Sequence, residues 1–166
     1  MENAQIISDE RSLPFFHSVS IRAFANVKIK TGDEQKIFIK AKNADVSNIK
    51  TKVKKKELVI TFKNVFRVVS HPVFDIEITF TEFRAITLKG AGKVFSDEVL
   101  KAKELDVISN GVGNIILKVE TEKLNTELKG VGMVELIGKT DFQKVILNGT
   151  GLVDNLELES KKADVT

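Results

Sequence analysis

Four Gly-x-Gly triplets recur at nearly constant spacing in the second half of this 166-residue chain. Successive first glycines are 21, 19 and 19 residues apart. A fixed period near 20 residues is typical of stacked supersecondary units, so it predicts a solenoid with rungs of about 19–21 residues. The triplets are Gly90-Ala91-Gly92, Gly111-Val112-Gly113, Gly130-Val131-Gly132 and Gly149-Thr150-Gly151.

The residues around each triplet are mostly apolar at even offsets from the first glycine. Even offsets share one face of an extended strand, so the pattern predicts β-strands rather than helices. The glycines have the same parity, and we expect them to point inward at rung corners, where a Cβ would collide or φ must be positive. The aligned inward positions are Ile86, Val107, Thr126 and Val145; Leu88, Ser109, Leu128 and Leu147; and Val94, Ile115, Val134 and Val153.

The same triplets also resemble the start of a phosphate-binding loop. A dinucleotide site needs a third glycine and a following helix, and the segment after Gly92 supplies neither. Fourfold repetition favours corner geometry, so we assign all eight triplet glycines a structural role. Asn148-Gly149-Thr150 fits an N-glycosylation acceptor, which we interpret as a coincidence because it lies inside a corner.

The first half of the chain lacks the triplets but keeps an alternating pattern. Apolar and lysine residues alternate in several short runs separated by turns, so we expect more strands and no substantial helix. The sequence therefore predicts one all-β solenoid domain over residues 1–166. Its expected parts are an N-terminal β region (1–80), the repeat rungs (81–158) and a polar tail (159–166).

A lysine cluster occupies residues 50–56. Alternation places Lys50, Lys52 and Lys54 on the outer face of one strand, followed by Lys55 and Lys56. One interpretation is a contact surface for acidic polysaccharide or lipid headgroups. The other, which charge-pattern rules favour, is a solvated strand edge that lysines protect from strand addition.

Residues that carry catalysis or bind metals are sparse. The absence of cysteine excludes disulfides and thiolate chemistry. His17 and His71 have no metal-ligand spacing, and we expect both in loops or at strand edges. Asp97-Glu98 and Asp141 fall in expected turns without a calcium-loop pattern. We therefore predict no catalytic residue, metal ligand or cofactor.

Composition limits the compartment and the partners. The formal net charge is +3, and the chain has neither Trp nor Tyr, which argues against a nucleic-acid reader. No apolar run has the length of a transmembrane span. The first residues do not read as a signal peptide. We expect the cell envelope, periplasm or surface if an upstream signal was removed, and otherwise the cytoplasm.

The beginning of the chain, from Arg11 to Ile21, resembles the opening of the head GIN domain proteins, a family also described as "putative auto-transporter adhesin". The pattern L-x-G-x-G-x-V at residues 88–94, 128–134 and 147–153 is the most specific shared feature. The resemblance covers about residues 11–158. It implies a right-handed β-helix-like solenoid in bacterial envelope or surface proteins, often of Bacteroidetes, and it brings no catalytic residue.

We therefore expect a non-enzymatic, adhesin-like interaction scaffold of the cell envelope or surface that contacts a protein or glycan surface. The open end of the solenoid could also pair with a second copy. Two alternatives stay open: a pectinase-like β-helix enzyme, which would need converging carboxylates in a groove, and a small-ligand carrier, which would need a hollow interior.

Overall fold

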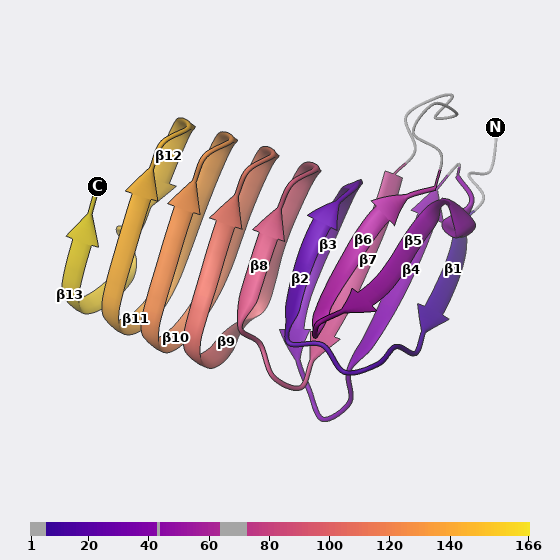
Figure 1. The fold of residues 1–166 in the computed structure, drawn as a ribbon, viewed down its shortest axis with the longest axis horizontal. Helices are drawn as coiled ribbons and strands as arrows, with labels where there is room; N and C mark the ends of the chain where they lie inside the picture. Colours follow the sequence, from indigo (N-terminus) through magenta and orange to yellow (C-terminus); the bar gives the residue numbers. More distant parts are fainter. Residues whose placement is uncertain (1–5, 43, 64–72) are drawn as a thin grey trace.

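The computed structural model describes residues 6–42, 44–63 and 73–166, which form one 13-stranded sheet wound into a solenoid (Figure 1). The predicted all-β solenoid is confirmed. Within these ranges the one helical element is the 3-10 turn η1 (Val46–Asn48). No helix in this part of the chain has the length and apolar character needed to cross a membrane. His71 lies outside the described residues.

The regular rungs lie in the second half, as the spacing predicts. β8 (Ala85–Leu88) leads into the long bent strands β9 (Ala91–Ser109), β10 (Val112–Leu128) and β11 (Val131–Leu147), and β12 (Thr150–Asp154) and β13 (Leu158–Val165) form the last rung. The strands pair in parallel, and equivalent residues stack; Gly113, for example, lies between Gly92 and Gly132. Most of the aligned apolar positions are buried, and the Val94, Ile115 and Val134 column is fully buried.

A fifth copy of the corner lies in the first half of the chain. β2 (Ser18–Arg22) pairs with β8, and β3 (Phe24–Thr31) pairs with β9. Phe24 stacks on Ala91, and Ala25 stacks on Gly92. The first copy therefore reads Ala-x-Ala where the later copies read Gly-x-Gly.

The N-terminal end is closed by strands that do not follow the repeat. β6 (Glu57–Phe62) and β7 (Val73–Phe80) pair in parallel with β2 and β3 on their outer sides. β5 (Ile49–Lys54) pairs antiparallel with β6, β4 (Lys36–Lys42) with β7, and β1 (Ile6–Arg11) with β4. The chain thus leaves the stack after β3, builds this end, and returns at β8 on the other side of the β2–β3 rung (Figure 1).

The last eight residues do not form a polar tail. Residues 158–165 are strand β13, which pairs in parallel with β11 from Gly138↔Leu158 to Val145↔Val165. Thr166 continues the ladder through backbone hydrogen bonds with Val145 and Leu147. Backbone groups form this ladder, and side chains add the Lys161–Asp141 ion pair and the Gln143–Ser160 hydrogen bond, so the charged side chains along the segment do not prevent pairing.

The triplet glycines face the neighbouring rung rather than the interior. A Cβ on Gly130 would lie 2.0 Å from the carbonyl oxygen of Gly111. A Cβ on Gly132 would lie 1.9 Å from the carbonyl oxygen of Gly113, and Gly132 has a φ of +138°. The expected inward collision is therefore replaced by a collision along the solenoid axis. The close approach of the backbones of two stacked corners therefore limits the size of the side chain at these positions.

Candidate functional site

The lysine face is the outer surface of β2, β6 and β5 at the N-terminal end of the solenoid. Lys50, Lys52 and Lys54 all lie exposed on β5, while Thr51 and Val53 between them are partly buried. Alternation therefore points the three lysines to one side, as the sequence predicts. They line a groove of about 800 Å³ together with Arg22 and Lys55, and Glu57 is the one acidic residue among its described lining residues.

The register across the three strands gives the lysine face its layout. Lys50 pairs with Thr61, which pairs with Arg22 on the next strand. Lys52 pairs with Val59, and Lys54 pairs with Glu57. Polar and small side chains therefore separate the lysine row on β5 from Arg22 on β2, and the surface stays open between them.

The turn between β5 and β6 has an unusual backbone. Lys54 pairs with Glu57, so Lys55 and Lys56 form a two-residue hairpin loop. Their φ angles are 52° and 60°, the pattern of a type I′ turn, where Asn-Gly is strongly preferred. A side chain other than glycine costs on the order of 1–2 kcal/mol in this region. The turn therefore presents two lysines at a cost in stability.

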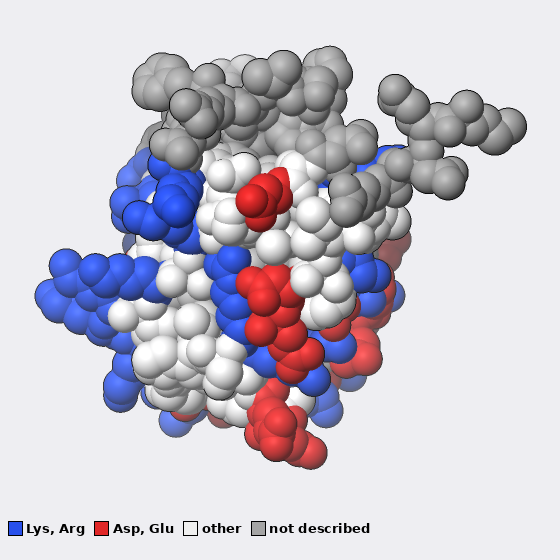
Figure 2. All heavy atoms as spheres, turned by 90° about the vertical axis from the view of Figure 1, so that its right-hand side faces the viewer, with Lys and Arg blue, Asp and Glu red and all other residues white. Residues whose placement is uncertain are grey.

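The charges of the lysine face are not neutralised by neighbours. Among the described residues, none of Lys50, Lys52, Lys54, Lys55 or Arg22 makes an ion pair. Figure 2 shows basic side chains protruding along one side of this end of the molecule, set apart from the central band of acidic ones. The face is therefore a region of uncompensated positive charge.

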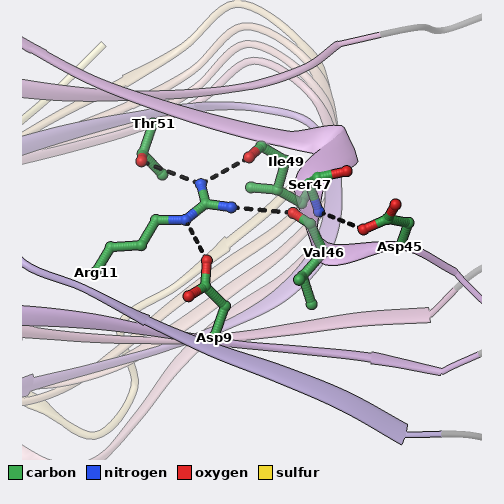
Figure 3. A network of polar contacts seen from close by, with 7 residues as sticks. All are labelled: Asp9, Arg11, Asp45, Val46, Ser47, Ile49 and Thr51. Carbon is green, nitrogen blue, oxygen red and sulfur yellow. Dashed lines mark hydrogen bonds and ion pairs between the residues drawn. The ribbon is translucent and has the colours of Figure 1, made fainter.

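A guanidinium clamp fixes the strand that carries the lysines (Figure 3). Arg11 donates from Nη1 to the carbonyl oxygen of Ile49 at 2.6 Å and to Thr51 Oγ1 at 3.1 Å, and from Nη2 to the carbonyl oxygen of Val46 at 3.0 Å. Its Nε donates to Asp9 Oδ2 at 2.8 Å. Val46 lies in η1, and Ile49 and Thr51 lie at the start of β5. One side chain from β1 therefore holds the beginning of the strand that carries the lysines.

The turn η1 is capped next to this clamp. The Ser47 N–H donates to Asp45 Oδ1 at 2.8 Å, and this hydrogen bond lowers the pKa of the Asp45 carboxyl. The cap satisfies a free backbone donor of the short turn. Arg11 and Asp45 together give β5 a defined starting point.

The residues considered for catalysis or metal binding do not come together. The described residues contain no group of three His, Asp or Glu side chains that could hold a metal ion. His17 lies in the bend before β2, with Nδ1 2.7 Å from Ser18 Oγ; burial, and then the nearby Arg84 charge, lower its pKa. Asp97 pairs with Lys28, and Asp141 pairs with Lys161. Both acids lie in continuous strand, not in the turns we expected.

Sequence reasoning missed Arg22 and the exposed corner residue Phe24. Phe24 is the middle residue of the Ala23-Phe24-Ala25 corner and Arg22 directly precedes it, and a search for glycine cannot find this corner. The signal was present in the flanks, since Ile21 to Val27 has the same arrangement as Leu88 to Val94. Aligning on the buried aliphatic positions would have found this copy.

Comparison with solved structures finds the same fold in several bacterial proteins. A "putative adhesin" from Bacteroides fragilis superposes with a TM-score of 0.88 at 23% identity, over 97% of this chain and 75% of that chain. A "putative lipid binding protein" from Parabacteroides distasonis has a TM-score of 0.73 at 16% identity, over 96% and 77%. A "putative adhesin" from the same species has a TM-score of 0.71 at 14% identity, over 98% and 78%. At these identities the likeness shows a shared fold.

No curated protein matches the chain. A family model does match it, over residues 15–166, and its description is "Putative auto-transporter adhesin, head GIN domain". This span includes every rung and almost all of the N-terminal end. The chain therefore belongs to the head GIN domain family of putative auto-transporter adhesins.

Proposed function

We propose that this chain is a non-enzymatic interaction module of the bacterial cell envelope or surface, and that its lysine face holds an extended polyanion such as an acidic polysaccharide. The observation that carries the proposal is the uncompensated charge: five basic side chains line the groove with one acid, Glu57. The strained turn at Lys55 and Lys56 supports it, because strain concentrates at functional sites.

The spacing of the lysines suits a linear ligand. Side chains on one face of a strand repeat every ~6.5–7 Å, so Lys50, Lys52 and Lys54 form a straight row of three charges. Lysine ammonium groups contact anions as point charges, which requires no single ligand geometry. Each exposed contact is weak and screened by salt. The expected affinity is therefore micromolar at best and falls steeply with ionic strength.

Family membership supports the envelope or surface location, since the family and two of the solved relatives are described as adhesins. A carrier with its ligand inside the solenoid is not supported. The interior columns, such as Leu105, Leu124 and Ile86, are fully buried aliphatic side chains. A hydrolytic or lyase function is less well supported. The described residues hold no group of three His, Asp or Glu side chains that could bind a metal ion, and the carboxylates that line the grooves on the rungs are interspersed with lysines.

Heparin affinity chromatography with a salt gradient tests the proposal. The wild-type chain should be retained and should elute at low salt, and Lys52→Glu/Lys54→Glu should elute earlier with an unchanged melting temperature. The matched control is Lys101→Glu/Lys103→Glu, which changes the net charge equally, at the same spacing, on exposed positions of β9. If both double variants elute alike, net charge alone explains retention and the lysine face is only a protected edge.

A second variant tests the turn. Lys55→Asn/Lys56→Gly supplies the residues that a type I′ turn prefers, so it should raise the free energy of unfolding by about 1–2 kcal/mol. It should also weaken heparin retention, because it removes two charges from the end of the lysine row. Increased stability with unchanged retention would show that the turn lysines take no part in binding.

A further inference from the structure

A second surface runs along the solenoid at the Gly-x-Gly corners, and it meets the lysine face at Arg22, which lines both grooves. The middle residue of the corner triplet points outward in all five copies, four with flanking glycines and one with flanking alanines, which gives a straight column of five stacked side chains about 19 Å long. Their register follows the rungs. The column consists of Phe24, Ala91, Val112, Val131 and Thr150.

Four of the five side chains in this column are apolar, and the larger ones are open to solvent. Phe24 is 54% exposed, Val112 58% and Val131 51%. Such exposure at three positions in one line forms a continuous apolar stripe, and contiguous apolar patches mark interaction sites. The Phe24 ring packs against that of Phe62, with ring centroids 5.7 Å apart. The apolar stripe therefore has a fixed aromatic end.

A basic and amide column runs beside the stripe. The residues immediately before the first corner residue are Arg22, Lys89, Asn110, Lys129 and Asn148. Together the two columns flank a groove of about 700 Å³ with the first glycines between them, and no acidic residue in the described part of the chain lines it. Lys129 pairs with Glu127 outside the groove, whereas Arg22 and Lys89 make no ion pair with a described residue.

We infer that this corner edge, defined by the two columns, docks on an anionic lipid bilayer surface. The basic side chains would contact headgroup phosphates, and the apolar stripe would enter the boundary between headgroups and acyl chains. Basic side chains near an anionic membrane contribute favourably to the free energy of binding, and apolar side chains contribute further when they are buried at the membrane interface. The charge of the groove favours an anionic partner, because among the described residues basic side chains line it and acidic ones do not.

The periodicity of the edge favours a bilayer over other partners. Nearly the same chemistry recurs on each rung, so the edge matches a continuous surface better than a protein with distinct anchor residues. Aliphatic Ala91, Val112 and Val131 offer no hydrogen bonds to sugar hydroxyls. Aromatic faces on which nucleic-acid bases could stack are present only at one end of the described groove, at Phe24 and Phe62. Acyl chains need neither.

Vesicle sedimentation tests the inference with two probes: vesicles of mixed phosphatidylglycerol and phosphatidylcholine, and vesicles of phosphatidylcholine alone. The wild-type chain should bind the mixed vesicles and not the neutral ones. Val112→Ser/Val131→Ser should reduce binding to the mixed vesicles by about tenfold. The matched control is Val99→Ser/Val165→Ser, which changes two valines that are also exposed but lie away from the corner. The inference is overturned if the two variants bind alike or if the wild type ignores the mixed vesicles.

A fluorescent reporter tests depth and orientation. The chain has no Trp, so Val131→Trp introduces a single emitter. Its emission should shift to the blue on mixed vesicles, and that of Val99→Trp should not. If the protein sediments with vesicles without a shift at position 131, another surface makes the contact and the inference fails.

The outcome is separable from that of the proposed function. The valine variants keep every charge of the lysine face, so their elution from heparin should not change. Loss of vesicle binding with intact heparin retention supports the corner edge specifically. Parallel loss of both would indicate misfolding or one shared surface, and it would overturn the assignment of two distinct surfaces.

Discussion

The regular rungs and the N-terminal end distribute charge in opposite ways. On the rungs, Lys101, Glu120, Lys139 and Glu159 stack in register, so the sign alternates along the axis. On β5, Lys50, Lys52 and Lys54 share one face of a single strand. A stacked repeat places each charge about 4.8 Å from its own equivalent, and like charges there are destabilising.

The comparison shows where such a fold can concentrate charge. A residue on a rung has its equivalents as neighbours, so a basic position is favourably followed by an acidic or amide one, as Lys89 is followed by Asn110. The step from Arg22 to Lys89, next to the N-terminal end, is an exception. The antiparallel strand β5 has no equivalent in the stack, and its lysines face Thr61, Val59 and Glu57 instead. The end of the solenoid is therefore freer to carry a single-sign surface than its sides.

The largest expected effect breaks the regular rungs. Gly130→Val adds a side chain where a Cβ would lie 2.0 Å from the Gly111 carbonyl oxygen. It should lower the free energy of unfolding by about 2–4 kcal/mol, measured by urea denaturation. The control is Ala23→Gly in the first corner copy, which should cost about 0.5–1 kcal/mol. An unchanged midpoint for Gly130→Val would contradict close approach of the corner backbones.

A smaller effect should be confined to the N-terminal end. Arg11→Ala removes hydrogen bonds to Ile49, Thr51 and Val46, and it should destabilise by about 2 kcal/mol because charged hydrogen bonds of this kind are lost. Amide exchange should rise in β1 and β5 while β10 and β11 stay protected.

Two further variants control for the Arg11 result. Arg11→Lys should recover little, since an ammonium cannot reproduce the fork of the guanidinium. Arg84→Ala removes an exposed arginine whose ion pair is with nearby Glu82, and it should change stability by less than about 0.5 kcal/mol. Uniform loss of protection across all strands would show that the clamp supports the whole solenoid rather than its end.

The smallest effect sharpens the view of the rung interior. Thr126 lies between Val107 and Val145 in the stack, and its buried Oγ1 has no hydrogen-bond partner among the described residues. Thr126→Val completes an aliphatic column and should stabilise by about 1 kcal/mol in the same denaturation assay.

Thr140→Val is the counterpart of this variant. Thr140 Oγ1 accepts from Thr121 Oγ1 at 2.9 Å and donates to the carbonyl oxygen of Phe142 at 3.0 Å. Loss of this hydroxyl should lower the free energy of unfolding by about 1 kcal/mol. If both threonine variants shift stability in the same direction, hydroxyl satisfaction does not govern the interior.

The rungs were predictable because the glycine spacing and the alternation of aliphatic residues both indicate stacked strands with a repeat of about 19–21 residues. Ala23-Phe24-Ala25 escaped detection because the first corner carries alanine where the later copies require glycine. The excursion through β4 and β5 could not be predicted, since alternation shows that a segment is a strand but not which strand it pairs with. β13 was hidden because its pairing uses backbone groups, while its exposed Lys161 and Lys162 look like a tail.

The candidate site divides in the same way. Alternation alone places Lys50, Lys52 and Lys54 on an outer face, and the structure has them there. Their proximity to Arg22 depends on β6 pairing with both β5 and β2, which is a long-range choice. The left-handed Lys55 and Lys56 contradict local turn preferences, so no sequence rule would have suggested them.

The closed N-terminal end fixes one end of the solenoid, so its length can change only at the other rungs. The β2–β3 rung lies between β6–β7 on one side and β8–β9 on the other, so units cannot be added there without dismantling the end. An extra 19-residue unit between two glycine corners would instead leave that end intact. Each inserted unit would move the far end about 4.8 Å from the lysine face and lengthen the corner edge by the same amount. The number of repeats would then set the distance between the lysine face and the far end of the solenoid in increments of one rung, and the lysine face itself would not change.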